Sequence, residues 1–298
     1  MSSLYHYTSG NSLLGILQSE TFWATDIRFL NDYEELNRGL DVCERFAEGL
    51  LKDLKEEREH LSEMLRILVG NIRRNANLTL INLVSFSTEP DNLRQWMAYG
   101  NSGSGYCIEF DSDLLIPESL SDFKNCLRLT PVEYIDNDFG FYHSSSLIKF
   151  TGFLFETVQS LGEKISEEIL IEKMSLRANR LLIDSMFVAS SIKPSEFSDE
   201  REIRLLYIGE NKEIEVHHNM DELHCLYKKP TLPDIGFKSS NDILVSYQPI
   251  PFNIKAVKKV IIGPTIDMKL AKLGITEFRD RNNLDFEITN SSCSLRKL

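Results

Sequence analysis

The chain has 298 residues, a length that suits one large domain or one domain with sizeable insertions. Its formal net charge of −12 argues against diffuse binding to nucleic-acid backbones, which requires a basic surface. No apolar run approaches the ~20 residues of a membrane span, and the first ten residues do not have the pattern of a signal peptide. The five cysteines include no CxxC pair, so we expect free thiols in a cytoplasmic protein without a membrane partner.

The N-terminal part is predicted to alternate short strands and helices. Residues 4–8 have a strand pattern, and Thr8 or Ser9 is placed to cap a helix whose apolar face carries Leu13, Leu14, Ile16 and Leu17. Residues 21–25 are β-branched and aromatic, which favours a strand. A long helical stretch over 40–75 then fits a two-helix insertion.

The remainder of the chain continues the mixture of strands and helices. A second helical insertion is predicted over 145–190. Another helix is predicted to end at Gly274, because glycine is a usual C-cap residue. The predicted strands cover 78–87, 106–110, 202–208, 243–247, 257–263 and 285–289. Strands near both ends with helices among them indicate a single α+β domain over 1–298, built around a mostly antiparallel sheet.

The first block with chemical potential is YHYTSG at the start of the chain. In a strand, His6 and Thr8 face one side, whereas Tyr5 and Tyr7 face the other. A histidine in the first strand of a domain is often a structural residue. Contact with a ligand is the functional alternative.

The second block is SFSTEPDNLRQWMAYG. Ser85 and Ser87 share one face of their strand, and the helix that follows carries an apolar stripe that includes Trp96. Most of this stripe fits a core. Gln95 and Tyr99 sit off the centre of the stripe and are candidates to line a cleft. Trp96 and Tyr99 are also candidates to stack on a planar ring of a ligand, because aromatic faces do this well.

The third block is FSDEREIRLL. In extended form, Glu200, Glu202 and Arg204 project from one face. Two carboxylates and a guanidinium are costly to bury unless they are paired. The row therefore fits either a surface ladder of ion pairs or a carboxylate held by Arg204 in a polar cleft, to which Lys193 adds a cation.

Two further groups of residues have competing interpretations. In ATDIRFLNDYEE, Asn31 suits a turn or a helix cap, or it contacts the phosphate or ribose of a ligand together with Arg28. The stretch HHNMDELHC gathers His217, His218 and His224, but no standard zinc spacing matches it. A polar loop is the preferred interpretation, and no metal site is predicted.

Taken together, these blocks resemble a bacterial family known as domain of unknown function 2971. The resemblance is carried by LYHYT, ATDIRFLNDYEE, SFSTEPDNLRQWMAYG, GYCIEFD, FSDEREIRL and VIIGP. It covers most of the chain and leaves the helical insertions at about 40–75 and 145–190 as the variable parts. The family name conveys no activity.

A weaker resemblance, to ADP-ribosyltransferases, lies beneath the first. It consists of an early-strand histidine, a strand ending in SFS, an aromatic residue on the next helix and a late-strand glutamate. It implies an ADP-ribosyltransferase-like α+β fold, with a mostly antiparallel split β-sheet core that grips NAD and with helical insertions. The chain lacks a recognisable active-site loop ahead of the glutamate.

The resemblance to ADP-ribosyltransferases also implies roles for individual residues. His6 bonds the ribose on the adenosine side of NAD, with Tyr7 and Thr8 beside it. Ser87 supports the other ribose, and Tyr99 or Trp96 stacks near nicotinamide. Either Glu202 or Glu200 is the catalytic carboxylate. The remaining expected substrate contacts are Arg28, Asn31, Lys193 and Arg204.

The expected function is therefore that of an enzyme that consumes NAD and transfers ADP-ribose to a macromolecule or to water. The acidic charge favours a protein over a nucleic acid as the acceptor. The kind of family suggests a bacterial toxin or a phage-defence effector. One alternative is a non-enzymatic module for ligand sensing or protein interaction. A second is a metal-dependent hydrolase that uses His217, His218 and His224.

Overall fold

The computed structural model describes most of the chain outside the two predicted insertions. The described residues are 3–30, 34–54, 79–123, 126–135, 183–210, 232–240 and 242–295, together with 73, 76, 145, 147, 148 and 152. Within the predicted insertion at 40–75, helix α2 (Glu35–Leu54) is described. The insertion predicted at 145–190 lies mostly outside the described residues, although 183–189 is helical.

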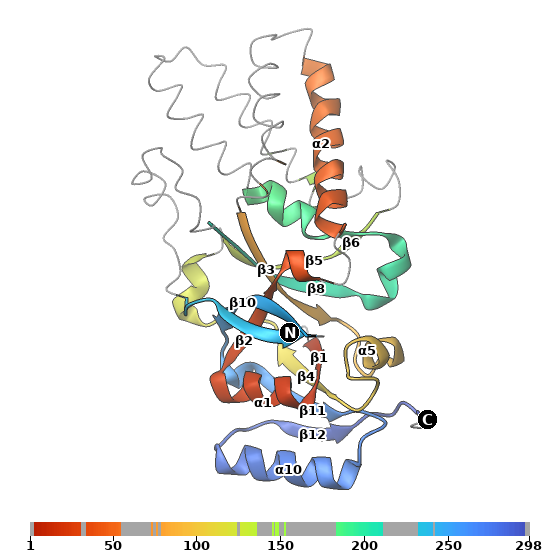
Figure 1. Cartoon of the computed structure of the whole chain (residues 1–298), viewed down its shortest axis with the longest axis vertical. Helices are drawn as coiled ribbons and strands as arrows, with labels where there is room; N and C mark the ends of the chain where they lie inside the picture. Colours follow the sequence, from red (N-terminus) through yellow and green to blue (C-terminus); the bar gives the residue numbers. More distant parts are fainter. Residues whose placement is uncertain are drawn as a thin grey trace.

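A ten-stranded mixed sheet forms the centre of the described part of the chain (Figure 1). Its main path runs β12-β11-β4-β1-β3-β2-β10-β9, and β8 joins β3 to β5. Every pairing in this sheet is antiparallel except that of β11 with β12. The predicted α+β class with a mostly antiparallel sheet is therefore confirmed.

The strands mostly fall where alternating and β-branched residues predict them. The N-terminal and central strands are β1 (Ser3–Thr8), β2 (Thr21–Asp26), β3 (Thr79–Ser87), β4 (Tyr106–Asp111), β5 (Leu127–Pro131) and β8 (Glu202–Glu210). The C-terminal strands are β9 (Gly236–Ser240), β10 (Ile243–Pro251), β11 (Val257–Ile262) and β12 (Glu287–Asn290). A separate parallel pair joins β6 (Glu133–Tyr134) to β7 (Ile192–Lys193).

The sheet branches at β3. At one end of this strand Ser87 pairs with Tyr5 of β1, and further along Leu83 pairs with Thr25 of β2. Both β1 and β2 thus occupy the same edge of β3, while β8 pairs along the other edge. In Figure 1 both strands lie below β3. Ser85 lies between the two pairings, so its carbonyl is open to a side chain at the branch.

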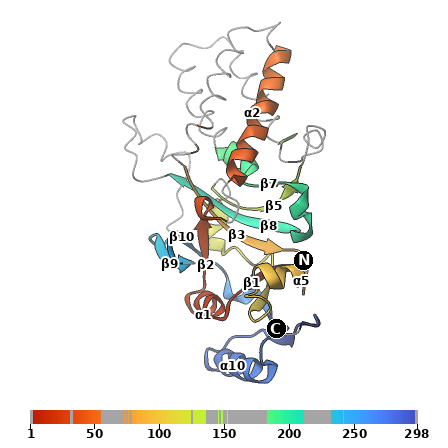
Figure 2. The same cartoon turned by 45° about the vertical axis from the view of Figure 1, so that its right-hand side comes forward.

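Besides the helical residues 183–189, four α-helices are described around the sheet. They are α1 (Gly10–Ser19), α2, α5 (Leu93–Ala98) and α10 (Met268–Arg281). Short 3-10 turns are η1 (Ile27–Phe29), η2 (Glu118–Phe123), η3 (Ser195–Glu200) and η4 (Ile254–Ala256). The helix α2 rises from the β8 side, and α10 lies at the opposite end of the molecule (Figures 1 and 2).

Two large hydrophobic clusters hold these elements together. One lies under α1 and α10 and includes Phe22, Phe86 and Phe110, whose rings meet edge to face at centroid distances of 5.2–6.0 Å. The other joins α2 to residues 186–189 and to β8. Because both clusters rest on the β3–β8 pair, the branch point is fixed from two sides.

The helix boundaries confirm one predicted cap and correct another. Ser9 is the N-cap of α1, and its hydroxyl accepts a hydrogen bond from Ser12 N at 3.2 Å. The expected end at Gly274 is wrong, because α10 continues to Arg281. The reason is that Ile275 and Phe278 extend the apolar face beyond the glycine. Leu14 is exposed and does not belong to the buried face of α1.

In the described part of the chain, no helix combines the length and apolar character that crossing a membrane would need.

Candidate functional site

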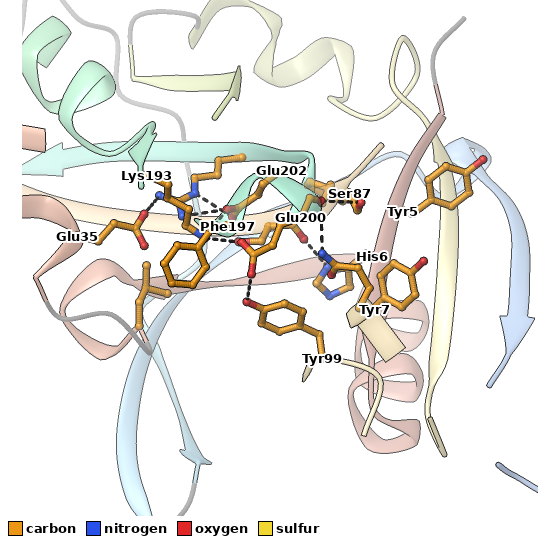
Figure 3. A pocket seen from close by; sticks show the side chains of 15 residues that line it. Tyr5, His6, Tyr7, Glu35, Ser87, Tyr99, Lys193, Phe197, Glu200 and Glu202 are labelled. Carbon is orange, nitrogen blue, oxygen red and sulfur yellow. Dashed lines mark hydrogen bonds and ion pairs between the residues drawn. The ribbon is translucent and has the colours of Figure 1, made fainter. Parts of the chain in front are cut away.

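A cavity of about 180 Å³ opens beside the branch in the sheet (Figure 3). Its walls come from β1, the end of β3, α5 and the residue after it, β7, η3, β8 and the start of α2. These segments lie far apart in the sequence. The predicted site residues among those that line it are His6, Tyr7, Ser87, Tyr99, Lys193, Glu200, Glu202 and Arg204.

A sharp corner between η3 and β8 places the two predicted glutamates. Glu200 ends η3, and Arg201 then adopts a left-handed conformation with φ of 43°. Glu202 and Arg204 follow in β8 at a spacing of two, which points both side chains to one face. Glu200 lies outside the predicted strand 202–208 and is not extended, yet its side chain lines the same cavity as Glu202 and Arg204.

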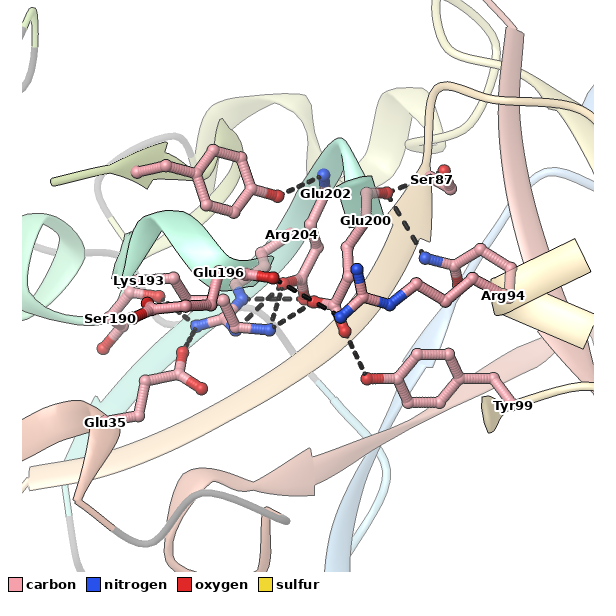
Figure 4. Close-up of polar contacts among 12 residues, drawn as sticks. Glu35, Ser87, Arg94, Tyr99, Ser190, Lys193, Glu196, Glu200, Glu202 and Arg204 are labelled. Atoms are coloured by element: carbon pink, nitrogen blue, oxygen red, sulfur yellow. Dashed lines mark hydrogen bonds and ion pairs between the residues drawn. The ribbon is translucent and has the colours of Figure 1, made fainter. Parts of the chain in front are cut away.

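Arg204 is the centre of a buried ionic cluster (Figure 4). Its Nε donates to Glu202 Oε1 at 2.9 Å and its Nη2 to Glu202 Oε2 at 3.1 Å. Its Nη1 donates to the Ser190 carbonyl at 2.6 Å and forms an ion pair with Glu35. The guanidinium thus holds two carboxylates from different elements, which is the fork geometry that arginine favours.

Lys193 connects this cluster to Glu200. Its Nζ lies 2.6 Å from Glu202 Oε2 and donates to Glu200 Oε2 at 2.8 Å. The other oxygen of Glu200 accepts a hydrogen bond from the Tyr99 hydroxyl at 2.8 Å. Figure 3 shows Glu200 between Tyr99 and Lys193, next to the Phe197 ring. Each oxygen of Glu200 thus receives one hydrogen bond and keeps acceptor capacity.

The charges of the cluster stabilise one another. Burial would raise the pKa of Glu202, but Arg204 and Lys193 lower it to about 2. Burial would likewise lower the pKa of Lys193, but Glu202, Glu35 and Glu200 raise it overall. At neutral pH the cluster therefore keeps Glu202 ionised and Lys193 protonated.

His6 lies at the branch in the sheet, with its ring near those of Phe22 and Phe86. Its Nδ1 is 2.9 Å from the Ser85 carbonyl, and a carbonyl only accepts, so Nδ1 carries the proton. Burial and Lys238 lower the pKa of His6 despite the opposing bond to Ser85. The neutral ring then presents Nε2 as an acceptor in a residue that lines the cavity.

Two predicted substrate residues use their hydroxyls to shape the site. Ser87 Oγ donates to the Glu200 carbonyl at 2.8 Å and accepts from Glu89 N at 3.1 Å. Tyr7 Oη donates to the Glu89 carbonyl and accepts from Asn92 N. Both side chains line the cavity, and both fix the loop between β3 and α5.

Three predicted residues are not among those that line the cavity. Trp96 is fully buried, packs edge to face on Tyr7 and donates to Asp91, so it is a core residue. Thr8 is buried at the end of β1. The Arg28 side chain pairs with Asp26. A fourth predicted residue, Asn31, lies outside the described residues.

The sequence interpretation missed Glu35 and Phe197. Glu35 is buried in the first turn of α2, and it stands in the ATDIRFLNDYEE block. A glutamate in a first turn usually complements the positive end of the helix, so sequence alone gave no reason to place it in a cavity. Phe197 lies in η3 within the SEF segment. Gln95, an expected cleft residue, does line the cavity.

The structure tests the metal alternative only in part. Over the described ranges, no group of three or more His, Cys, Asp and Glu side chains is placed to hold a metal ion. The histidines on which the hydrolase hypothesis rests, His217, His218 and His224, lie outside those ranges.

Comparison with known families gives one match. Residues 95–205 match the family described as "Protein of unknown function (DUF2971)". The expected resemblance to this family is therefore confirmed over residues 95–205. The matched DUF2971 segment contains Tyr99, Lys193, Glu200, Glu202 and Arg204, whereas the first two strands precede it. Neither the curated proteins nor the solved structures gave a match.

The DUF2971 segment thus supplies four of the five Glu, Lys and Arg side chains that line the cavity. The N-terminal part supplies His6 and Glu35 to the same cavity. This arrangement provides a cluster of carboxylates, a neutral imidazole acceptor and several aromatic rings around a space of limited size. Such a set suits the binding of a polar ring compound and the stabilisation of positive charge near a carboxylate.

Proposed function

We propose that this protein consumes NAD in an ADP-ribosyltransferase-like reaction in the cavity between β1 and η3. The observation that carries the proposal is the position of Glu200. Its carboxylate lines the cavity, is held in place by Tyr99 and Lys193, and shares the cavity with the neutral His6. Two separate parts of the chain therefore hold one group that is suited to cation stabilisation, and a third part places His6 in the same cavity.

The size of the cavity fits one end of NAD. A dry cavity of about 150 Å³ is known to accept a benzene molecule, and this one measures about 180 Å³. One six-membered ring therefore fits inside, beside the rings of Tyr99 and Phe197. We place nicotinamide there, with the rest of the dinucleotide extending outward past His6.

Glu200 suits the chemical role better than Glu202 does. Arg204 engages both oxygens of Glu202, and Lys193 adds a further contact. Glu200 has one hydrogen bond on each oxygen, and its side chain is 10% exposed, against 5% for Glu202. We therefore assign the catalytic carboxylate to Glu200 and a positioning role to Glu202.

The reaction breaks the bond between the nicotinamide nitrogen and C1′ of the ribose. The bonding electron pair leaves with nicotinamide, and positive charge develops on the sugar as in glycoside hydrolysis. The Glu200 carboxylate stabilises this charge and takes the proton of the acceptor as the acceptor oxygen bonds to C1′. His6 Nε2 accepts a hydrogen bond from a hydroxyl of NAD. With water as acceptor, the product is free ADP-ribose.

One observation favours a second candidate, a non-enzymatic ligand-sensing module. Every carboxylate oxygen of Glu200 and Glu202 already contacts a side chain of the protein itself. A cluster of this kind also maintains the shape of a pocket that only binds. Such a module would bind NAD without cleaving it.

The deciding experiment is incubation of the purified protein with NAD, with and without cell extract, while released nicotinamide is measured. We expect release, with radiolabelled ADP-ribose recovered either free or attached to a macromolecule. Saturable binding of NAD with no release under either condition would overturn the enzymatic proposal in favour of the sensing module.

A further inference from the structure

The ionic cluster at the cavity contains more carboxylates than cations. Glu35, Glu200 and Glu202 contribute three formal negative charges, and Lys193 and Arg204 contribute two positive ones. All five side chains are buried (Figure 4). The cluster therefore has an excess of one negative charge in a place where water screens it weakly.

The surplus charge belongs to Glu35. Glu200 has Lys193 as its ion-pair partner, and Glu202 has the bidentate contact with Arg204. Glu35 shares Arg204 with Glu202 and forms no other ion pair within the described part of the chain. Removal of the Glu35 charge would therefore leave equal numbers of anions and cations in the cluster.

Other charged groups near the cavity do not cancel this excess among the described residues. Arg94 pairs with Asp199, and Arg201 pairs with Glu89, so each pair is neutral, and none of these four residues lines the cavity. The His6 ring is neutral because burial lowers its pKa. Lys238 does not line the cavity, and its Nζ donates to Thr25 Oγ1 at 2.9 Å.

Two of the aromatic rings that line the cavity also favour a positively charged ligand. They are those of Tyr99 and Phe197, which both lie next to Glu200 (Figure 3). The face of an aromatic ring attracts a cation, and the Phe197 ring already has the Lys193 ammonium 5.5 Å from its centroid. A flat cation in the cavity would meet both the aromatic surface and the excess negative charge.

We infer that the cavity selects a planar organic cation over its neutral analogue, and that Glu35 supplies the deciding charge. This inference rests on the proposed function, because the oxidised nicotinamide ring of NAD is such a cation. It deepens that function by making the protein specific for the oxidised form of the dinucleotide. Reduced dinucleotide, with its neutral ring, would bind more weakly.

The test compares 1-methylnicotinamide, a cation, with nicotinamide, its neutral analogue, by isothermal titration calorimetry at pH 7. We expect wild type to bind the cation at least about tenfold more tightly, as one weakly screened charge implies. The variant Glu35→Gln should lose most of this preference. Glu44→Gln is the matched control, because Glu44 lies on the same helix and is paired with Arg73 away from the cavity.

Several results would overturn the inference. They are equal affinity of wild type for both compounds, failure of both to bind, and full cation preference in folded Glu35→Gln. If that variant does not fold, the wild-type ratio still decides whether the cavity selects a cation. Cation preference without NAD cleavage would refute the proposed function alone, whereas cleavage without cation preference would refute only this inference.

Discussion

Two carboxylates contact the two ends of the α5 region, and they differ in how completely the protein satisfies their oxygens. Asp91 contacts Trp96 within the helix, and Glu200 contacts Tyr99 directly after it. Asp91, just before the helix, accepts hydrogen bonds from Trp96 Nε1, from the Ser291 hydroxyl and from both N and Oγ of Ser292. These donors are neutral, and they tie the C-terminal segment to α5. Asp91 thus has every oxygen filled by two or more donors of the chain, as expected of a structural residue.

Glu200, which contacts the residue after the same helix, is less completely satisfied. Each of its oxygens receives one hydrogen bond, from Tyr99 or Lys193, and the side chain borders a cavity. The difference shows how a site is distinguished from a structural contact. A carboxylate at a site is fixed in place by the protein but keeps acceptor capacity on the side of the ligand.

The largest change in the free energy of unfolding should come from a substitution of Arg204, the centre of the ionic cluster at the cavity. Arg204→Met leaves Glu35 and Glu202 buried without their shared cation, which should lower the free energy of unfolding by about 3–5 kcal/mol. Urea unfolding measures this loss. The control Arg94→Met removes an exposed ion pair with Asp199 and should cost less than about 1 kcal/mol. Similar losses in both variants would contradict a buried cluster.

The next effect concerns pH. The pKa of Glu202 is depressed from 4.5 to about 2 in the folded chain, so its contribution to stability is present above pH 4.5 and lost as the pH falls towards 2. Between pH 6 and pH 3 wild type should lose about 2 kcal/mol more than Glu202→Gln does. Urea unfolding at the two pH values checks this. Parallel losses would mean that Glu202 is not stabilised as described.

A smaller effect is expected at the structural carboxylate. Asp91→Asn weakens the hydrogen bonds to Ser291 and Ser292 and should cost about 1–2 kcal/mol of stability. Hydrogen exchange should quicken at residues 291–295, which these bonds hold. Unchanged exchange in this segment would show that Asp91 does not anchor it.

The smallest expected effect is a gain far from both carboxylates. Gly274 lies inside α10, and an added Cβ would meet nothing within 4 Å. Gly274→Ala should therefore raise the free energy of unfolding by about 0.5–1 kcal/mol. Urea unfolding measures this gain on the same scale as the losses of unfolding free energy predicted above. A loss of stability would contradict a helix that continues through residue 274.

The sequence predicted those parts of the fold and site that depend on local patterns. Alternating residues located most strands, and the spacing of two in β8 placed Glu202 and Arg204 on one face. His6 and the two glutamates do share a cavity, as the proposed roles required. These features follow from residues close together in the chain.

The parts that the sequence did not reveal depend on contacts between distant segments. Glu35 joins the site only because α2 packs on the side of β8 where Arg204 lies. No local spacing encodes this contact. Trp96, by contrast, lies in the core as the apolar stripe of its helix predicted, and it packs there on Tyr7. Gly274 was misjudged because its local preference for ending a helix is overruled by packing of Ile275.

The most direct test of the proposed activity compares the two carboxylates in one assay. Nicotinamide release from NAD is measured for wild type, Glu200→Gln and Asp91→Asn at equal concentrations of folded protein. If Glu200 stabilises the transition state and accepts the proton, Glu200→Gln should lose about 10²-fold or more in rate, while Asp91→Asn should remain within about threefold of wild type. Equal rates in wild type and Glu200→Gln would contradict the assignment of Glu200 as the catalytic carboxylate.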